Sequence, residues 1–452
     1  MTLGQFGRLT DAPANLLLAG VRLIDPNDGS DTVRDLAIVD GFIRDPALLP
    51  AGAERVDATG LVAGPGFCDL HAHLREPGDE ATETISSGAQ AAARGGFTTV
   101  CAMPNTEPPL DERARIGWVV ERARDAACRV RVIGAVSVGR AGDALAELGS
   151  MAESGAVAFS DDGAAVSSPR LARTAMTYLR GLGLPLIEHA EDASLAGGVM
   201  RTGPTASRLG LAGWPASAEL TVVERDIALA AETGARLHLT HLSTGAALET
   251  VRRARARGLP VTCDVTPHHL AMTDAWVAGS RQFAWEDGPA DGEPLDPDRA
   301  YDGRCRVNPP LASREDALAL LAGLADGSVD AIATDHAPHP PQRKLVPFDD
   351  AAPGLIGLET ALSLGLAAVA AGRLELATLV AALSIRPAEI IGERRSLAPG
   401  QAADLVVFDP EARWRVEASA LASASSNTPL LGMELPGVVR MTVADGRITY
   451  RA

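Results

Sequence analysis

Leu61-Val-Ala-Gly-Pro-Gly-Phe-Cys-Asp-Leu-His-Ala-His73 is an apolar stretch that closes on two histidines separated by one residue. Successive side chains of a β-strand point to opposite faces, so a spacing of two places both imidazoles on the same face. Two imidazoles on one face can bind a single metal ion together. The stretch therefore predicts a buried strand whose carboxyl end carries a metal site.

The same kind of strand recurs through residues 61–391, where short apolar, β-branched runs alternate with longer Ala-, Leu- and Arg-rich segments of helical character. This alternation is typical of β/α units that build a parallel sheet. We expect eight strands, at residues 61–73, 97–103, 130–138, 156–160, 184–189, 236–241, 260–266 and 329–335. Eight such units predict an α/β fold with a closed (β/α)8 barrel of the TIM type; a doubly wound open sheet is the alternative.

Both ends of the chain have a different character, with short strands around Asp-Gly turns. Asp40-Gly41 and Asp445-Gly446 each stand between β-rich runs, which is a hairpin signal. We expect residues 1–60 and 392–452 to form the N-terminal and C-terminal parts of one small β-sandwich domain, beside a barrel domain at 61–391.

The overall composition excludes several classes of protein. A content of 46% hydrophobic and 22% charged residues is ordinary for a globular chain. The net charge of −17 would repel a phosphate backbone, so we expect neither nucleic-acid nor membrane partners. With no secretory signal and five scattered cysteines lacking a C-x-x-C pair, the chain is expected to be cytoplasmic, with free thiols.

The histidines cluster in the predicted barrel. Nine histidines lie in or just after the first, fifth, sixth, seventh and eighth strands: His71, His73, His189, His238, His241, His268, His269, His336 and His339. Any one alone is better explained as a core or loop histidine. Together they indicate an active site, because barrel enzymes build theirs at the carboxyl ends of strands. His238 is expected to face away from the site, and the roles of His268, His269 and His336 stay open.

Other residues at strand ends complete a metal centre. His189 and His241 occupy the same place on neighbouring strands and could hold a second ion. Asp161 and Asp162 close the fourth strand, where a carboxylate could bridge two ions, although Asp-Asp-Gly could also be only a turn. Asp335 ends the eighth strand, beside the first, and could bind an ion and transfer a proton. Two ions roughly 3.5–4 Å apart would lower the pKa of a bridging water to about 7, which favours amide hydrolysis.

Five motifs give the chain a family resemblance over nearly its whole length. They are Asp69-Leu-His-Ala-His-Leu-Arg-Glu-Pro-Gly78, Met103-Pro-Asn-Thr106, Phe159-Ser-Asp-Asp-Gly163, Val307-Asn-Pro-Pro310 and Thr334-Asp-His-Ala-Pro-His339. In these motifs the chain resembles the class I dihydroorotases of the amidohydrolase superfamily. H-x-H alone is shared by many amidohydrolases, whereas H-x-H-x-R followed by M-P-N-T and D-D-G is specific.

The resemblance implies a role for each site residue. One zinc ion is bound by His71, His73 and Asp335, a second by His189 and His241, and Asp162 bridges them. Asp335 is also the acid/base. The substrate is bound by Arg75, Asn105, Asn308 and His339. The implied reaction is the reversible cyclisation of N-carbamoyl-L-aspartate to L-dihydroorotate in de novo pyrimidine (UMP) biosynthesis, by a metal-bridging hydroxide.

Two alternatives to this function stay open. Hydantoinase-like dihydropyrimidinases and allantoinases share the H-x-H motif but commonly bridge their metals with a carboxylated lysine on the fourth strand. The single lysine of this chain, Lys344, follows the eighth strand, so it argues against that bridge. The second alternative is a non-catalytic, dihydroorotase-like partner of aspartate transcarbamoylase, although every expected ligand is present. A homodimer and a transcarbamoylase complex are both open, and either residues 276–303 or, as we expect, a mobile lid at 340–354 could cover the site.

Overall fold

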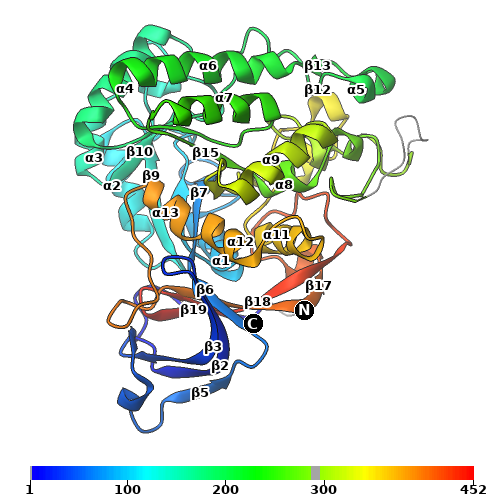
Figure 1. Ribbon diagram of the computed structural model, residues 1–452. Helices are drawn as coiled ribbons and strands as arrows, with labels where there is room; N and C mark the ends of the chain where they lie inside the picture. The colour runs from blue at the N-terminus through cyan, green and yellow to red at the C-terminus, as the bar shows by residue number, and fades with distance from the viewer. Residues whose placement is uncertain (1–2, 287–295) are drawn as a thin grey trace.

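The computed structural model describes residues 3–286 and 296–452. Figure 1 shows an upper part in which helices surround a barrel of strands and a lower part in which N-terminal strands lie beside C-terminal ones. The predicted fold class, a barrel with a small β domain built from both termini, is confirmed. Among the described residues, no helix combines the length and the apolar character needed to cross a membrane.

Eight parallel strands form the barrel. They are β7 (Phe67–Ala72), β8 (Phe97–Ala102), β9 (Arg129–Gly134), β10 (Ala156–Phe159), β11 (Leu186–Glu188), β14 (Leu237–Leu239), β15 (Val261–Val265) and β16 (Ala331–Ile332). Each strand pairs with the next in chain order, which makes β7 and β16 the two ends of the path. A parallel bridge between Ala72 and His336 brings these ends together, and the His73 N–H donates to the His336 carbonyl at 2.8 Å. This contact favours the closed barrel over an open sheet.

Helices cover the outside of the barrel or lie in the connections that follow its strands. They are α1 (Ile85–Arg94), α2 (Arg113–Arg122), α3 (Leu148–Glu153), α4 (Pro169–Leu182), α5 (Pro204–Leu209), α6 (Ala216–Thr233), α7 (Gly245–Ala256), α8 (Pro267–Ala271), α9 (Arg314–Asp326), α10 (Pro341–Lys344), α11 (Ala361–Ala370), α12 (Leu376–Leu383) and α13 (Ile385–Ile390). Helix α4 shows how local sequence sets their limits. Ser168 caps its first turn by accepting from the Leu171 N–H, Pro169 follows, and Gly183 ends it in the left-handed conformation.

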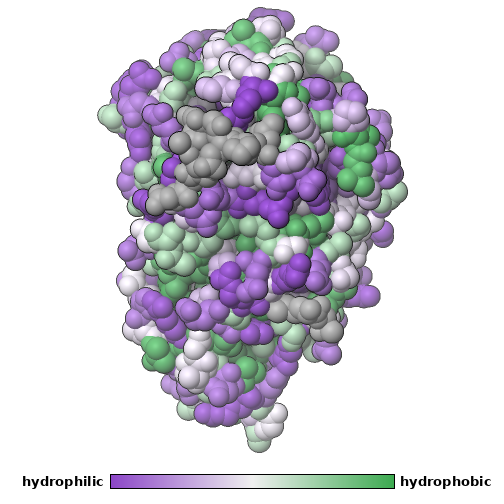
Figure 2. Space-filling view, turned by 90° about the vertical axis from the view of Figure 1, so that its right-hand side faces the viewer, coloured by the Kyte–Doolittle hydropathy of each residue, from purple (hydrophilic) through white to green (hydrophobic). Residues whose placement is uncertain are grey.

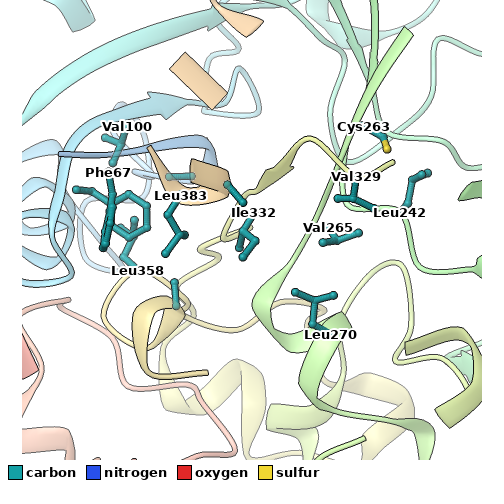
Figure 3. Close-up of a cluster of buried hydrophobic side chains, with 14 of the residues drawn as sticks. Phe67, Val100, Leu242, Cys263, Val265, Leu270, Val329, Ile332, Leu358 and Leu383 are labelled. Carbon is teal, nitrogen blue, oxygen red and sulfur yellow. The ribbon is translucent and has the colours of Figure 1, made fainter. Parts of the chain in front are cut away.

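Apolar side chains fill the space between strands and helices. Figure 3 shows Phe67 and Val100, from neighbouring strands, gathered with Leu383 of α12, while Ile332 and Val265 continue the same layer along the barrel. All five side chains are buried. Burial on both faces explains why these strands read as continuous apolar runs.

One curled sheet forms the small domain. Its strands are β1 (Gln5–Phe6), β2 (Leu16–Asp25), β3 (Ser30–Val39), β4 (Phe42–Arg44), β5 (Glu54–Asp57), β6 (Val62–Pro65), β17 (Leu405–Arg415), β18 (Glu434–Ala444) and β19 (Arg447–Arg451). The two ends of the chain meet twice, where β1 pairs with β19 and where β6 lies between β2 and β17. Both Asp-Gly pairs form turns with positive φ, at 50° and 80° for Asp40-Gly41 and at 49° and 76° for Asp445-Gly446. The limits of the two domains stay predictions.

The strand predicted at 61–73 is wrong in one respect, because the structure divides it between two sheets. β6 belongs to the small sheet and β7 to the barrel, and Gly66 stands between them. The Gly66 N–H donates to the Asp404 carbonyl at 2.9 Å, and a Cβ at this position would lie 2.3 Å from Cγ2 of Thr98. Only glycine fits there.

The chain forms one more sheet besides the barrel and the sheet of the small domain. β12 (Met200–Arg201) and β13 (Gly213–Trp214) make a separate two-stranded sheet after β11. The predicted loop at 276–303 includes residues 287–295, which lie outside the described residues.

Figure 2 shows a face that is mostly hydrophilic with scattered apolar areas, as the net charge of −17 leads one to expect.

Candidate metal centre

Six polar side chains meet at the carboxyl end of the barrel. They are His71 and His73 from the end of β7, Asp162 after β10, His189 after β11, His241 after β14 and Asp335 after β16. Each is at most 7% exposed. Strand ends that are far apart in sequence therefore place four imidazoles and two carboxylates in one buried space.

The donor atoms form two overlapping groups. His71, His73 and Asp335 make one, and His71, Asp162 and His241 the other; within each group the atoms lie no more than 4.8 Å apart. In the first group, Asp335 Oδ1 lies 3.1 Å from His73 Nε2 and 3.5 Å from His71 Nε2. His189 joins the second group, since its Nδ1 lies 2.9 Å from His241 Nε2.

Asp162 stands at the centre of the six. Its Oδ1 lies 3.2 Å from His71 Nε2, 3.5 Å from His189 Nδ1 and 3.8 Å from His241 Nε2. Its Oδ2 lies 3.7 Å from His73 Nε2. This is the place that a carboxylate shared by two ions requires.

Asp161, its neighbour, points elsewhere. Its Oδ1 accepts the N–H groups of Val136 and Ser137 at 2.9 and 3.0 Å, and its Oδ2 accepts the Ser137 hydroxyl. Asp161 therefore ties the end of β10 to the loop after β9. Of the two residues that the sequence left open, only Asp162 faces the histidines.

The charges of the site are arranged for cations. Burial alone would lower the pKa of His71, but the carboxylates of Asp162 and Asp335 raise it to about 9. In the same way, Asp162 and Glu191 outweigh burial and raise the pKa of His189 to about 10. Against the cost of burial, the surrounding imidazoles hold the pKa of Asp162 and of Asp335 well below the usual range. Both carboxylates are therefore ionised at neutral pH.

A second layer of hydrogen bonds orients the imidazoles, which the sequence analysis missed. His71 Nδ1 lies 3.0 Å from the Thr240 hydroxyl, which donates to Asp264 at 3.1 Å. Asp264 also accepts the backbone N–H of His241 at 2.6 Å and pairs with His238 Nε2 at 2.7 Å. The sequence signal that could have revealed Asp264 is a carboxylate inside the apolar run of β15, where it is buried. His238, predicted to face away from the metal site, forms hydrogen bonds with Thr262 and Asp264 of β15.

The four residues expected to bind substrate divide into three positions. Arg75 and His339 adjoin, with 3.4 Å between Nη2 and Nε2. Asn105 touches the metal group itself, through His73 Nδ1 at 2.8 Å and Asp162 Oδ2 at 3.2 Å. Asn308 donates to Glu191 at 2.6 Å. Arg75 has φ +58°, a conformation that a non-glycine residue adopts at a cost and that often marks a functional position.

Two residues near the site had no assigned role in the sequence analysis. Glu191 accepts from His189 Nε2 at 2.9 Å as well as from Asn308, so it connects a candidate ligand to a candidate substrate contact. Arg140 donates to the backbone carbonyls of Asp161 and Asp162 and so supports the turn that aims Asp162. Neither residue stands in a sequence motif that would reveal its role, because the contacts of both depend on how the loops fold.

The other histidines near the strand ends are also buried. His269 Nε2 donates to the Pro309 carbonyl at 2.9 Å, and His336 Nδ1 accepts the Gly357 N–H at 3.2 Å, which are structural contacts. Neither ring nitrogen of His268 has a hydrogen-bond partner among the described residues. Burial lowers the pKa of His268 to about 4, so its ring is neutral.

Comparison with known proteins places the chain in a family. A family model described as dihydro-orotase-like matches residues 60–247. The chain is 44% identical to the dihydroorotase of Pelobacter propionicus, over 97% of this chain and 100% of that protein. It is 48% identical to the dihydroorotase of Anaeromyxobacter sp. strain K, over 96% and 98%. Among solved structures, L-hydantoinase (dihydropyrimidinase) from Arthrobacter aurescens shares the fold, with a TM-score of 0.83 and 24% identity over 97% of this chain and 96% of that one. Similarity of this extent to the curated relatives confirms the resemblance carried by the five motifs: the chain belongs to the dihydroorotase family.

Proposed function

We propose that the chain is a metal-dependent hydrolase of cyclic amides, a dihydroorotase, which interconverts N-carbamoyl-L-aspartate and L-dihydroorotate. The observation that carries the proposal is the buried group of four histidines and two aspartates, with Asp162 at its centre. Family membership supports the choice of substrate, since relatives 42–48% identical over nearly the whole chain are dihydroorotases.

The donor atoms fit a pair of divalent ions. His71 Nε2 and Asp162 Oδ1 are buried without a hydrogen-bond partner among the described residues, which is costly unless another group satisfies them. Imidazole nitrogens and carboxylate oxygens are ligands that zinc accepts. His71, His73 and Asp335 would hold one ion, His189 and His241 the other, and Asp162 both. When bound, such ions activate water and polarise a carbonyl.

Asp335 is suited to move the proton. Its carboxylate is ionised and lies beside His73 and His71, so it can accept a proton from the water that attacks the ring amide. In the hydrolytic direction the C–N bond of the ring breaks, and Asp335 returns the proton to the leaving nitrogen. In the biosynthetic direction these transfers reverse.

Arg75 is suited to bind the substrate carboxylate. Its Nε donates to the Pro338 carbonyl at 3.2 Å, which fixes the plane of the guanidinium beside His339. A planar guanidinium binds a carboxylate through two parallel hydrogen bonds.

Arg75→Ala is expected to raise KM for dihydroorotate by about 10- to 100-fold with kcat nearly unchanged, because the lost contact binds substrate and transition state alike. Steady-state kinetics in the hydrolytic direction measure both constants. Arg75→Lys keeps the charge but not the paired hydrogen-bond geometry, so its KM should fall between that of the wild type and that of Arg75→Ala. An unchanged KM in Arg75→Ala would remove Arg75 from the substrate site.

Metal binding is expected to release protons. At pH 7 the metal-free chain has protonated His71 and His189, whose pKa values are about 9 and about 10, and only neutral imidazole binds a metal. These two histidines should therefore release up to two protons on zinc binding at pH 7, in addition to any proton lost by metal-bound water, and fewer as the pH rises through 9 and 10. Calorimetric titration in buffers of different ionisation enthalpy counts them. A heat that does not depend on the buffer at pH 7 would contradict the assignment.

A second function compatible with the same fold is hydantoin or allantoin hydrolysis, since hydantoinase structures share that fold. A carboxylated lysine cannot bridge the metals here, since Lys344 is the single lysine and its Nζ is bonded to three backbone carbonyls. Assays on dihydroorotate, hydantoin and allantoin, together with an anomalous-scattering map for zinc, separate the functions. Absence of both metal and turnover would support the non-catalytic partner, and a zinc peak would identify the ion.

Three other expectations remain part of the proposal. The substrate is a small molecule, the compartment is the cytoplasm, and a homodimer or a complex with aspartate transcarbamoylase is open. Size-exclusion chromatography with light scattering, with and without the transcarbamoylase, tests the assembly.

A further inference from the structure

Lys344 is the single lysine of the chain, at the last position of helix α10, and its side chain is 2% exposed. Its ammonium donates to the backbone carbonyls of Arg306 at 3.1 Å, Ala352 at 2.6 Å and Gly354 at 2.8 Å. An ammonium has three N–H donors, so all of them are used. Among the described residues, no carboxylate pairs with it within 4.0 Å.

These carbonyls belong to two segments that border the substrate side of the site. Ala352 and Gly354 flank Pro353, whose carbonyl accepts from His339 Nε2 at 2.8 Å. Arg306 lies two residues before Asn308, and its carbonyl also accepts the Gly354 N–H at 2.9 Å. One cation thus joins the turn that carries Asn308 to the segment that orients His339.

We propose that Lys344 is a positioning residue, which holds residues 339–354 and the turn at 303–308 in the arrangement that presents His339 and Asn308 to the substrate. The inference rests on the proposed function for the identity of that substrate. On this proposal the segment is a fixed wall of the site, which is an alternative to the mobile lid expected at 340–354.

The surroundings of the ammonium make this role specific. Burial lowers the pKa of Lys344 to about 7; Cys305 and Asp302 act against that shift, and Arg306 and Arg304 add to it. A buried apolar side chain of similar length would avoid this cost of desolvation but would leave the Ala352 carbonyl without a donor. The carbonyls of Arg306 and Gly354 would each lose one of two donors and keep the Gly354 N–H at 2.9 Å and Asn427 Nδ2 at 3.2 Å. Lysine is therefore required for the order of these segments more than for packing.

The test compares Lys344→Met with Arg94→Met in the full-length, zinc-loaded chain. Arg94 is another buried cation, paired with Glu359 at 2.6 Å and stacked on Trp414 of the small sheet. Lys344→Met is expected to raise KM for dihydroorotate by about 10- to 100-fold, with kcat within about threefold and the zinc content of the wild type. Arg94→Met should lower the melting temperature and leave KM unchanged, which is the signature of a purely structural cation.

An unchanged KM in Lys344→Met, or a rise in KM that comes with lost zinc, would overturn the inference. If Lys344→Met does not fold, Lys344→Gln, which keeps two N–H donors, should fold and show a smaller rise in KM. A wild-type KM in that variant would equally overturn the inference.

Two readouts are independent of the substrate, so failure of the inference and failure of the proposed function can be told apart. Because the chain has one lysine, ¹³Cε-lysine labelling gives a single NMR signal, whose titration should show a pKa below that of free lysine. In Lys344→Met, the amides of Ala352 and Gly354, bonded to Arg343 and Arg306, should exchange hydrogen faster. An ordinary lysine pKa, or unchanged hydrogen exchange of these amides, would refute the positioning role of Lys344, even if the wild-type chain turns over dihydroorotate. Absence of that turnover with both readouts as expected would refute only the proposed function.

Discussion

Asp335→Asn is expected to lower kcat for dihydroorotate hydrolysis by at least about 10³-fold, which corresponds to about 4 kcal/mol of transition-state stabilisation. Asparagine has nearly the same size as aspartate, so the fold should survive. It cannot accept the proton of the attacking water, and it has no charge to offer an ion beside His71 and His73. The loss should appear in both directions, because in the proposed mechanism the same group takes and returns the proton.

The measurement is kcat in both directions, with zinc in excess and metal content determined for each sample. Asp330→Asn is a matched control, because Asp330 directly precedes β16, the strand that Asp335 follows. Its carboxylate pairs with Arg255 and accepts the Cys263 N–H at 2.8 Å, away from the histidines. This variant should lose stability and keep its kcat. Wild-type rates in Asp335→Asn would exclude Asp335 from the mechanism.

Asp162→Asn is expected to reduce the bound zinc to at most one ion per chain and to lower turnover by at least about 10³-fold. Asp162 Oδ1 lies within 3.8 Å of nitrogens from His71, His189 and His241, so one carboxylate serves both halves of the centre. Replacing it with an amide removes the negative charge that would offset the proposed pair of cations. Excess zinc should restore little activity.

Asp161→Asn provides the control, because it changes the adjacent residue in the same way. Asp161 accepts from Val136 and Ser137 and points away from the histidines. Its replacement should lower the melting temperature by several degrees and leave the zinc content unchanged. Elemental analysis after dialysis, with a thermal melt, measures both properties. Two ions retained in Asp162→Asn, or zinc lost only in Asp161→Asn, would reverse the assignment.

Most of the fold could be predicted because the signals for it are local and periodic. Apolar runs alternating with helical segments indicated the barrel, and both Asp-Gly pairs form the predicted turns. The error at residues 61–73 has a physical cause: an apolar strand looks the same whether it pairs in one sheet or in two. What divides it is the close approach of Thr98 to Gly66, a long-range contact that no local pattern records.

The sequence predicted the histidines of the candidate site but not the residues that support them. Histidines at strand ends could be found because a strand end is recognisable and imidazole is a common metal ligand. The supporting residues, such as Asp264, Glu191 and Arg140, could not, since their partners come from other strands and loops.

The sequence by itself determined the residue types at the strand ends, the barrel that brings those ends together, and the family to which the motifs belong. Only the tertiary structure decided which of two adjacent aspartates faces the histidines, and that the single lysine donates to backbone carbonyls of two separate segments. The physical reason is that strand side chains follow a period of two, so their direction can be read along the chain. Side chains in loops follow no period, and their direction is set by contacts with residues distant in the sequence.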